Sequence, residues 1–116
     1  SRPYEDISFV KGDPRYHETL ERANVKDASL AIILADDQIN NPDAYSIIIG
    51  NELEKMNPSL IKIAEITDER WKSIFTDSGI DVFVSEKKFL KSIHSKANNQ
   101  VSEILEKVME KRSVDD

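Results

Sequence analysis

Short apolar runs rich in β-branched residues alternate with segments of helical periodicity along this chain. Four of these runs predict β-strands: Ile7–Val10, Leu30–Leu34, Leu60–Ile66 and Asp81–Val84. Leu30–Leu34 is apolar throughout, which is typical of a parallel strand covered on both faces. Because strands that alternate with helices form parallel sheets with crossover connections, we expect an α/β fold with about four parallel strands.

Three segments between the runs have apolar residues at helical spacing. These stripes are Tyr16, Leu20 and Ala23; Tyr45, Ile48, Ile49, Leu53 and Met56; and Trp71, Ile74 and Phe75. Each segment also begins with residues that favour the start of a helix.

The expected helix starts are Asp13-Pro14 and Asn41-Pro42, each a capping side chain followed by proline at the first helical position. Thr67 or Asp68 is expected to cap the third helix. Gly79 is expected to end that helix, because glycine adopts the left-handed conformation that often follows a helix.

The C-terminal part of the chain has a different pattern. From Glu86 to about Arg112 there is neither proline nor glycine, and apolar residues recur on one helical face. A polar stretch, Lys96–Gln100, is a candidate break between two helices. We therefore expect residues 1–85 to form the α/β lobe and residues 86–116 to form a long helical segment. Packing of this segment on its own sheet and packing on a partner both remain open.

Composition excludes several classes of protein. The 116 residues suit one domain, with a formal net charge of −6 and no cysteine. Disulfides and thiolate zinc sites are therefore excluded, and the acidic balance argues against a nucleic-acid partner. No apolar stretch reaches the roughly 18–20 residues of a membrane helix, and no secretory signal opens the sequence.

The order of several segments resembles one protein family. These segments are Phe9–Pro14, Thr19–Val25, Ala28–Asp37, Leu53–Pro58, Ile61–Glu65 and Ser78–Ser85. They resemble the second half of RCK domains (regulators of potassium conductance, also called Trk-type N-terminal domains), which control potassium channels and transporters. The resemblance implies a partial Rossmann-like lobe and a regulatory, non-enzymatic function.

The family's Gly-x-Gly-x-x-Gly loop and the elements around it do not occur in this sequence. We therefore expect nucleotide binding by this chain to be weak or absent. The incomplete sheet would leave an exposed edge, which oligomerisation or strand exchange would cover. The implied partners are further copies of the chain, as a dimer or larger ring, and a pore-forming membrane subunit. The implied location is the cytoplasmic side of a membrane, where ligands would rearrange paired lobes.

Candidate ligand-binding residues follow the predicted strands, because parallel sheets bind ligands at the carboxyl ends of their strands. The resemblance implies that Asp13 lies beside a bound nucleotide, although a helix cap explains Asp13 without any ligand, and Asp36 is a second candidate for nucleotide contacts. The resemblance implies that Glu65 helps to hold calcium or another divalent cation, and Asp37 and Asp68 on neighbouring strand ends are candidates for further ligands of that site.

Glu65 needs a partner most clearly, because it interrupts an apolar strand and a buried unpaired carboxylate is costly. A cation, a hydrogen-bond donor or an exit to solvent would satisfy it. Family members gated by calcium have acidic residues at the positions of Ala35 and Thr67, so a pairing of Glu65 with lysine or arginine is an equal alternative.

The remaining polar residues do not form a catalytic motif. His17 and His94 are the only histidines, and neither belongs to a nucleophile or zinc-binding pattern. The resemblance also implies that the helices of Ile47–Ile49 and Trp71–Phe75 take part in dimer contacts. A receiver-like domain, with Asp36-Asp37 as its acidic pair, or a nucleotide-binding oxidoreductase domain remains the alternative.

Overall fold

A computed structural model describes residues 13–84 and 103–110 of the chain. The elements in the first range are α1 (His17–Arg22), η2 (Val25–Asp27, a 3-10 helix), β1 (Leu30–Ile33), α2 (Pro42–Met56), β2 (Ile61–Glu65), η3 (Glu69–Trp71, a 3-10 helix), α3 (Lys72–Asp77) and β3 (Asp81–Phe83). Residues 103–110 form a further helix.

The three strands form one parallel sheet in the order β1-β2-β3. Leu30 of β1 pairs with Ile61 of β2, and Glu65 of β2 pairs with Phe83 of β3. This arrangement confirms the predicted α/β class with a parallel sheet and crossover helices. The predicted strand Ile7–Val10 lies outside the described residues, as does most of the predicted C-terminal segment.

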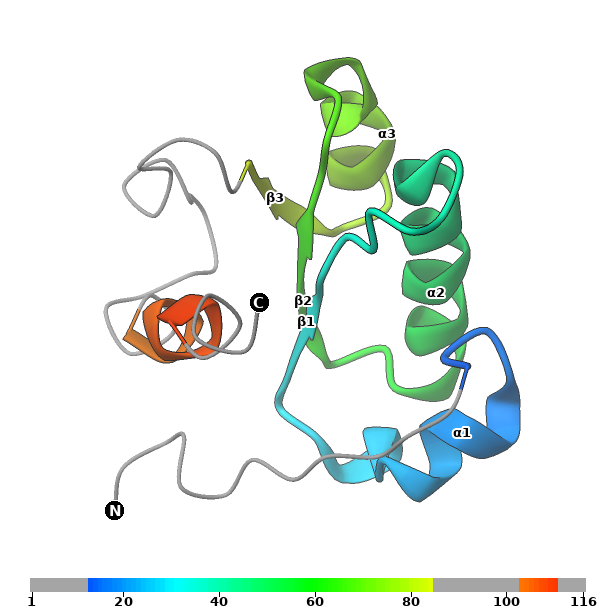
Figure 1. Cartoon of the computed structure of the whole chain (residues 1–116). Coiled ribbons are helices and arrows are strands. Elements are labelled where there is room, and N and C mark those ends of the chain that lie inside the picture. The colour runs from blue at the N-terminus through cyan, green and yellow to red at the C-terminus, as the bar shows by residue number, and fades with distance from the viewer. Residues whose placement is uncertain (1–12, 85–102, 111–116) are drawn as a thin grey trace.

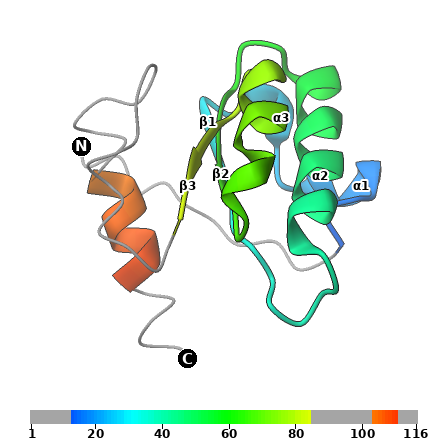
Figure 2. The same ribbon diagram turned by 90° about the horizontal axis from the view of Figure 1, so that it is seen from above.

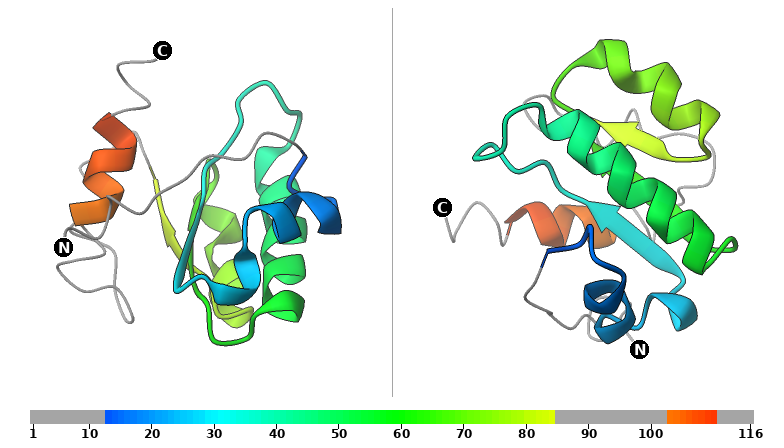
Figure 3. Two further views of the ribbon diagram at one scale, coloured as in Figure 1. Left: turned by 90° about the horizontal axis from the view of Figure 1, so that it is seen from below. Right: turned by 90° about the vertical axis from the view of Figure 1, so that its right-hand side faces the viewer.

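Helices cover both faces of the sheet (Figures 1 and 2). On one face α2 packs near β1 and α3 near β3, as the right-hand view of Figure 3 shows. Alternation along β2 divides the core, because successive strand residues point to opposite faces. Ala64 belongs to the cluster beneath α2 and α3, whereas Ile63 packs with Phe83 and Leu105 beneath helix 103–110.

The start of α2 confirms its predicted cap. Asn41 has a left-handed backbone (φ 58°), its side chain accepts a 3.4 Å hydrogen bond from the amide of Ala44, and Pro42 takes the first helical position. The buried face of the helix differs from the predicted stripe, because Ile48 is exposed. Gly50 lies inside instead, where a Cβ would stand 2.5 Å from the side chain of Ile80. Because residues two positions apart lie on nearly opposite sides of a helix, Ile48 points outward when Gly50 faces the core.

The start of α1 corrects the predicted helix boundary. The helix begins at His17, and Pro14 lies in the turn before it. Asp13 therefore does not cap α1: its carboxylate accepts a hydrogen bond from the amide of Arg15 within that turn. Of the predicted stripe only Leu20 is buried, because this helix has only six residues.

The segment around α3 follows the prediction more closely. Asp68 caps η3 by accepting a 2.9 Å hydrogen bond from the amide of Arg70. Gly79 has a φ of 79°, the left-handed conformation expected after α3. Phe75 is fully buried, whereas Ile74 is exposed. None of the helices in the described residues is long and apolar enough to cross a membrane.

Candidate ligand site at the carboxyl ends of the strands

The loops that follow β1 and β2 lie at the carboxyl ends of the parallel strands, where the sequence predicts a ligand site. Figure 1 shows residues 34–41 leading from β1 to the N-terminal end of α2. Residues 66–68 connect β2 to η3 beside that end of α2. Two acidic side chains bind these loops: Glu65 at the end of β2 accepts a hydrogen bond from the loop after β1, and Asp43 of α2 accepts hydrogen bonds from the loop after β2.

Glu65 is the first of these side chains. Its residue is 3% exposed, and its Oε1 accepts a 2.8 Å hydrogen bond from the backbone amide of Ala35. The sequence predicts that the Glu65 carboxylate needs a partner, and a backbone amide in the loop after β1 is one such partner. This bond ties the end of β2 to the start of the neighbouring loop.

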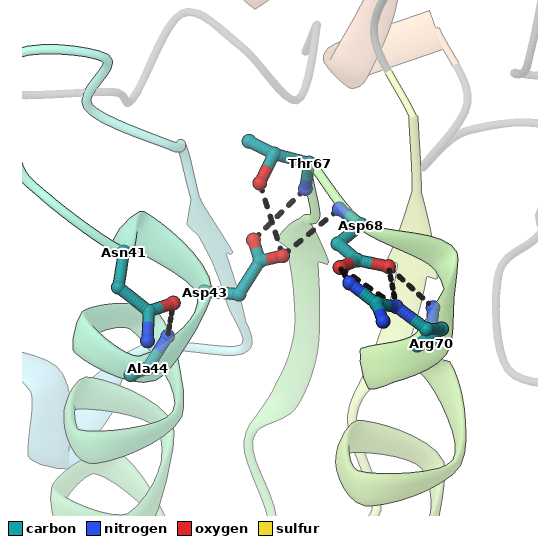
Figure 4. Close-up of polar contacts among 6 residues, drawn as sticks. All are labelled: Asn41, Asp43, Ala44, Thr67, Asp68 and Arg70. Atoms are coloured by element: carbon teal, nitrogen blue, oxygen red, sulfur yellow. Dashed lines mark hydrogen bonds and ion pairs between the residues drawn. The ribbon is translucent and has the colours of Figure 1, made fainter.

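Asp43 is the second of these side chains, and it contacts Thr67 and Asp68 after β2 (Figure 4). It lies in the first turn of α2 and is 1% exposed. Oδ1 accepts a 2.8 Å hydrogen bond from the Thr67 amide, and Oδ2 accepts bonds of 3.0 Å from Thr67 Oγ1 and 2.9 Å from the Asp68 amide. Sequence reasoning missed Asp43, although an acidic residue just inside a helix that follows a strand is a recognisable signal.

Asp68 has two local roles. Besides capping η3, its carboxylate binds the guanidinium of Arg70, with 2.7 Å between Oδ2 and the nearest terminal nitrogen. Hydrogen bonds from the Arg70 side chain are the main cause of a lowered pKa of Asp68. Asp68 is therefore an ionised carboxylate that already has protein partners.

Asp36 and Asp37 lie in the exposed loop after β1. Oδ1 of Asp36 accepts a 2.9 Å hydrogen bond from the amide of Gln38, and Asp37 accepts a 3.3 Å bond from the Gln38 side chain. Within residues 13–84 and 103–110 no group of three or more acidic or histidine side chains is arranged to hold a metal ion. The cation site assigned to Glu65, Asp37 and Asp68 therefore stays a prediction.

Asp13 forms a cluster with Arg15 and Tyr45. Its carboxylate binds the Arg15 guanidinium (2.7 Å to the nearest terminal nitrogen), and the Tyr45 hydroxyl donates a 2.9 Å hydrogen bond to Oδ1. The guanidinium also lies over the Tyr45 ring, 4.9 Å from its centre. Hydrogen bonds from Arg15 are the main cause of the low pKa of Asp13, whereas burial raises the pKa of Tyr45.

A groove of about 490 Å³ lies against β1, beside this cluster. Its polar border includes Asp36 and Tyr45, and its wall is mostly apolar, with residues from α1, β1 and α2. The wall includes Leu20, Leu30, Ile32, Ile49 and Leu53. Asp36 therefore borders the groove itself, whereas Asp13 does not line it and contacts its border residue Tyr45. An apolar wall with a few polar groups is the usual composition of a small-molecule site.

His17 is an exposed side chain. Its Nδ1 lies 3.3 Å from Oε2 of Glu52, and its Nε2 lies 3.7 Å from Oε1 of Glu21. These are contacts between α1 and α2 and within α1. His94 lies outside the described residues.

Comparison with known proteins identifies a family and a relative of the chain. The calcium-gated potassium channel TvoK of Thermoplasma volcanium is 30% identical over 84 residues, which cover 68% of this chain and 24% of the channel. The chain thus spans about a quarter of the length of this relative. No solved structure matches the chain significantly. The TrkA-N domain family matches residues 3–86, most of the chain, and the chain therefore belongs to the TrkA-N domain family.

Proposed function

We propose that this chain is a regulatory domain, without enzymatic activity, of a potassium channel or potassium transporter, on the cytoplasmic side of the membrane. The family match over residues 3–86 and the similarity to a calcium-gated potassium channel support this function. The single structural observation that supports it best is the groove against β1, bordered by Asp36 and Tyr45. The end of the groove at Asp36 lies at the carboxyl end of β1, and parallel α/β sheets bind ligands at the carboxyl ends of their strands.

Ligand binding regulates the parent protein by favouring one arrangement of paired lobes over another. The free energy available is the difference between the affinities of the ligand for the two arrangements. A ligand that contacts the rim of the groove touches the loop after β1 and, through Tyr45, α2. Both segments are therefore placed to respond to it.

Assembly of several copies is the second part of the proposal. Ile48 of α2 and Ile74 of α3 are 53% and 45% exposed, and both belong to the helices expected to form dimer contacts. Single exposed isoleucines are ordinary on protein surfaces, so the resemblance to RCK domains is what supports assembly through these helices. The partners are a second copy of the chain and a pore-forming membrane subunit.

Isothermal titration of the chain with calcium chloride, ATP, ADP and NAD tests ligand sensing. Amide chemical shifts then locate any bound ligand. We expect the ligand that binds to shift the amides of Asp36 and Tyr45, and nucleotide affinity to be weak because the sequence contains no Gly-rich loop. Asp36→Asn should weaken binding, whereas Asp77→Asn, the same change at an exposed position of α3, should not.

Two results would contradict ligand sensing by this groove: no heat with any of the four ligands, or shifts confined to residues away from it. Sedimentation velocity over a range of concentrations tests assembly separately. Ile48→Asp and Ile74→Asp should each shift the chain toward monomer. A wild-type chain that stays monomeric at every concentration would exclude self-association through these helices.

A further inference from the structure

The groove against β1 runs along the edge of that strand rather than over one face of the sheet. Successive strand residues point to opposite faces, and the groove is lined by residues of both faces. Leu30 and Ile32 belong to the cluster on one face, whereas Ala31 and Ile33 belong to the cluster on the other. β2 pairs with the opposite edge of β1, and among the described residues no strand pairs with the groove edge. The groove therefore lies where a further strand of the sheet would pair.

The register of β1 identifies the backbone groups at this edge. The Ile61 amide of β2 donates a 3.1 Å hydrogen bond to the carbonyl of Ser29. Because the backbone groups of successive strand residues point to opposite edges, Ala31 also faces β2, whereas Leu30 and Ile32 face the groove. Backbone groups in mostly apolar surroundings require hydrogen-bond partners, and a neighbouring strand supplies them at the spacing of a sheet.

The side chains of β1 are also only partly covered. The strand is apolar throughout, which predicts cover on both faces, yet Leu30, Ala31 and Ile32 are half-buried. Within the strand only Ile33 is buried. An apolar strand that pairs along the groove would cover the exposed parts of these side chains.

The N-terminal part of the chain reaches this groove at the carboxyl end of β1. Pro14 lines the groove, and the Asp13 carboxylate lies 2.9 Å from the hydroxyl of Tyr45, which lines it too. Tyr45 lies in the first turns of α2, the helix to which the carboxyl end of β1 leads. A strand ahead of Asp13 that runs parallel to β1 would end at this position. The predicted strand Ile7–Val10, which lies outside the described residues, is separated from Asp13 by only two residues.

The handedness of the connections assigns this segment to the same edge of the sheet. α2 connects β1 to β2, α3 connects β2 to β3, and both helices lie on one face (Figure 3). The hydrophobic cluster of that face also includes Leu20 of α1. Crossovers between parallel strands are right-handed in about 98% of cases, so helices on one face advance across the sheet in one direction. The strand that precedes α1 therefore belongs on the side of β1 opposite to β2.

We propose that the groove along β1 binds residues 7–10 of the same chain as a fourth parallel strand. This segment has four residues, as β1 has, and Ile7, Phe9 and Val10 supply apolar side chains. Asp36 lies beyond the last residue of β1, so the added strand leaves that end of the groove to a ligand. The inference goes beyond the proposed function and does not depend on it.

Hydrogen exchange followed by NMR tests the pairing in the full chain. Ala31 and Ile33 face β2 and serve as the internal reference. We expect the amides of Leu30 and Ile32 to be protected as well as those of the reference residues, because a paired strand edge protects its amides. Exchange of Leu30 and Ile32 at the rate of an unstructured peptide would overturn the inference.

Proline substitutions test whether the proposed segment gives this protection. Neighbouring amides of a strand point to opposite edges, so either Ser8→Pro or Phe9→Pro removes a hydrogen bond to β1. In that variant exchange of Leu30 and Ile32 should become about tenfold faster, the effect of one lost hydrogen bond. Glu5→Pro, ahead of the segment, is the matched control and should behave as the wild type. Protection that persists in both proline variants would mean that another segment binds the groove.

A spin label provides a test that does not depend on the folding of the proline variants. The chain has no cysteine, so Ser8→Cys gives a single attachment site. The label should broaden the amides of β1 more strongly than those of β3, because β2 separates β3 from β1. The same label at Asp77→Cys, on the helix that packs near β3, should give the opposite order. A label at position 8 that broadens β3 more than β1 would refute the proposed pairing.

A mixed sample shows whether the strand comes from the same chain. Spin-labelled Ser8→Cys is mixed with isotope-labelled wild type, which has no cysteine to carry a label. We expect the β1 amides of the wild type to stay sharp. Broadening of these amides would mean that the strand comes from a second copy, and the assignment to the same chain would be wrong.

Discussion

The hydroxyl of Tyr45 donates a 2.9 Å hydrogen bond to the carboxylate of Asp13, across 32 positions of the sequence. The bond ties the turn ahead of α1 to the first helical turns of α2, and the Arg15 guanidinium lies over the same tyrosine ring. Because Tyr45 also borders the groove, these contacts shape the rim of the candidate ligand site.

Tyr45→Phe should remove this bond and keep the ring beneath Arg15. We expect the free energy of unfolding to fall by about 1 kcal/mol, the usual net contribution of one hydrogen bond. Urea denaturation at neutral pH measures the change. Tyr16→Phe is the matched control, because Tyr16 is exposed and its replacement should change stability by less than about 0.5 kcal/mol. Equal losses in the two variants would show that the Tyr45 hydroxyl contributes nothing specific.

The Asp13–Arg15 pair predicts a pH dependence of stability. Arg15 holds the pKa of Asp13 below its usual range, so below about pH 4 the unfolded chain binds more protons at this residue than the folded chain. The stabilisation is complete above the unfolded pKa and is lost as the pH falls toward the lower folded pKa. Asp13→Asn should therefore flatten the fall in urea midpoint between about pH 4 and pH 2. A variant whose midpoint falls as steeply as that of the wild type would refute this assignment.

Lys62 predicts an asymmetry between two substitutions. Its side chain is 3% exposed, and its Nζ donates to Oε1 of Glu54 at 2.6 Å and to the Leu60 carbonyl at 3.3 Å. Glu54→Gln leaves the buried ammonium without its counterion and should cost about 1–2 kcal/mol, less than for a fully buried pair because Glu54 is half exposed. Lys62→Met should be close to neutral, since it removes the charge itself.

Chemical denaturation of the two single variants and the double variant measures this asymmetry. Once Lys62 is methionine, Glu54→Gln should have almost no further effect, because no ammonium remains to be neutralised. If Lys62→Met proves the more damaging single substitution, the pair stabilises the fold more than its desolvation costs.

Leu105 tests how helix 103–110 packs on the sheet. It is 0% exposed and clusters with Ile63 of β2 and Phe83 of β3. Leu105→Ala should lower the free energy of unfolding by about 2–5 kcal/mol, through lost burial and the cavity left behind. Glu106→Ala, at the next and exposed position, should stay within about 0.5 kcal/mol of the wild type. If the two variants unfold at the same urea concentration, the helix does not pack through Leu105.

Features that depend on neighbours in the sequence were predicted most accurately. Asn41 caps α2, Asp68 caps η3 and Gly79 takes a left-handed backbone, each as its local sequence indicates. The prediction for Asp13-Pro14 was wrong, although the same rule was used. There the Asp13 carboxylate binds Arg15 and Tyr45, and the helix begins only at His17.

The candidate site was predicted less completely than the fold. Asp36 borders the groove and Glu65 lies buried at a strand end, as their positions indicate. The sequence does not show that the Ala35 amide is a partner of Glu65, because this donor is 30 residues away along the chain. The position of Asp43 just inside a predicted helix is a signal, but the sequence does not show that its donors are Thr67 and Asp68, 24 and 25 residues further along the chain.

The sequence by itself determined the parallel α/β fold, since apolar β-branched runs, caps and helix-ending glycine act over a few neighbouring residues. Only the tertiary structure decided how the carboxylates are used and which apolar side chains remain outside. Glu65 binds the amide of Ala35 and Asp43 binds the amide of Thr67, because parallel pairing brings the ends of β1 and β2 together. Ile48 is exposed because Gly50 lets α2 approach Ile80 closely, and a helical stripe alone cannot reveal that rotation.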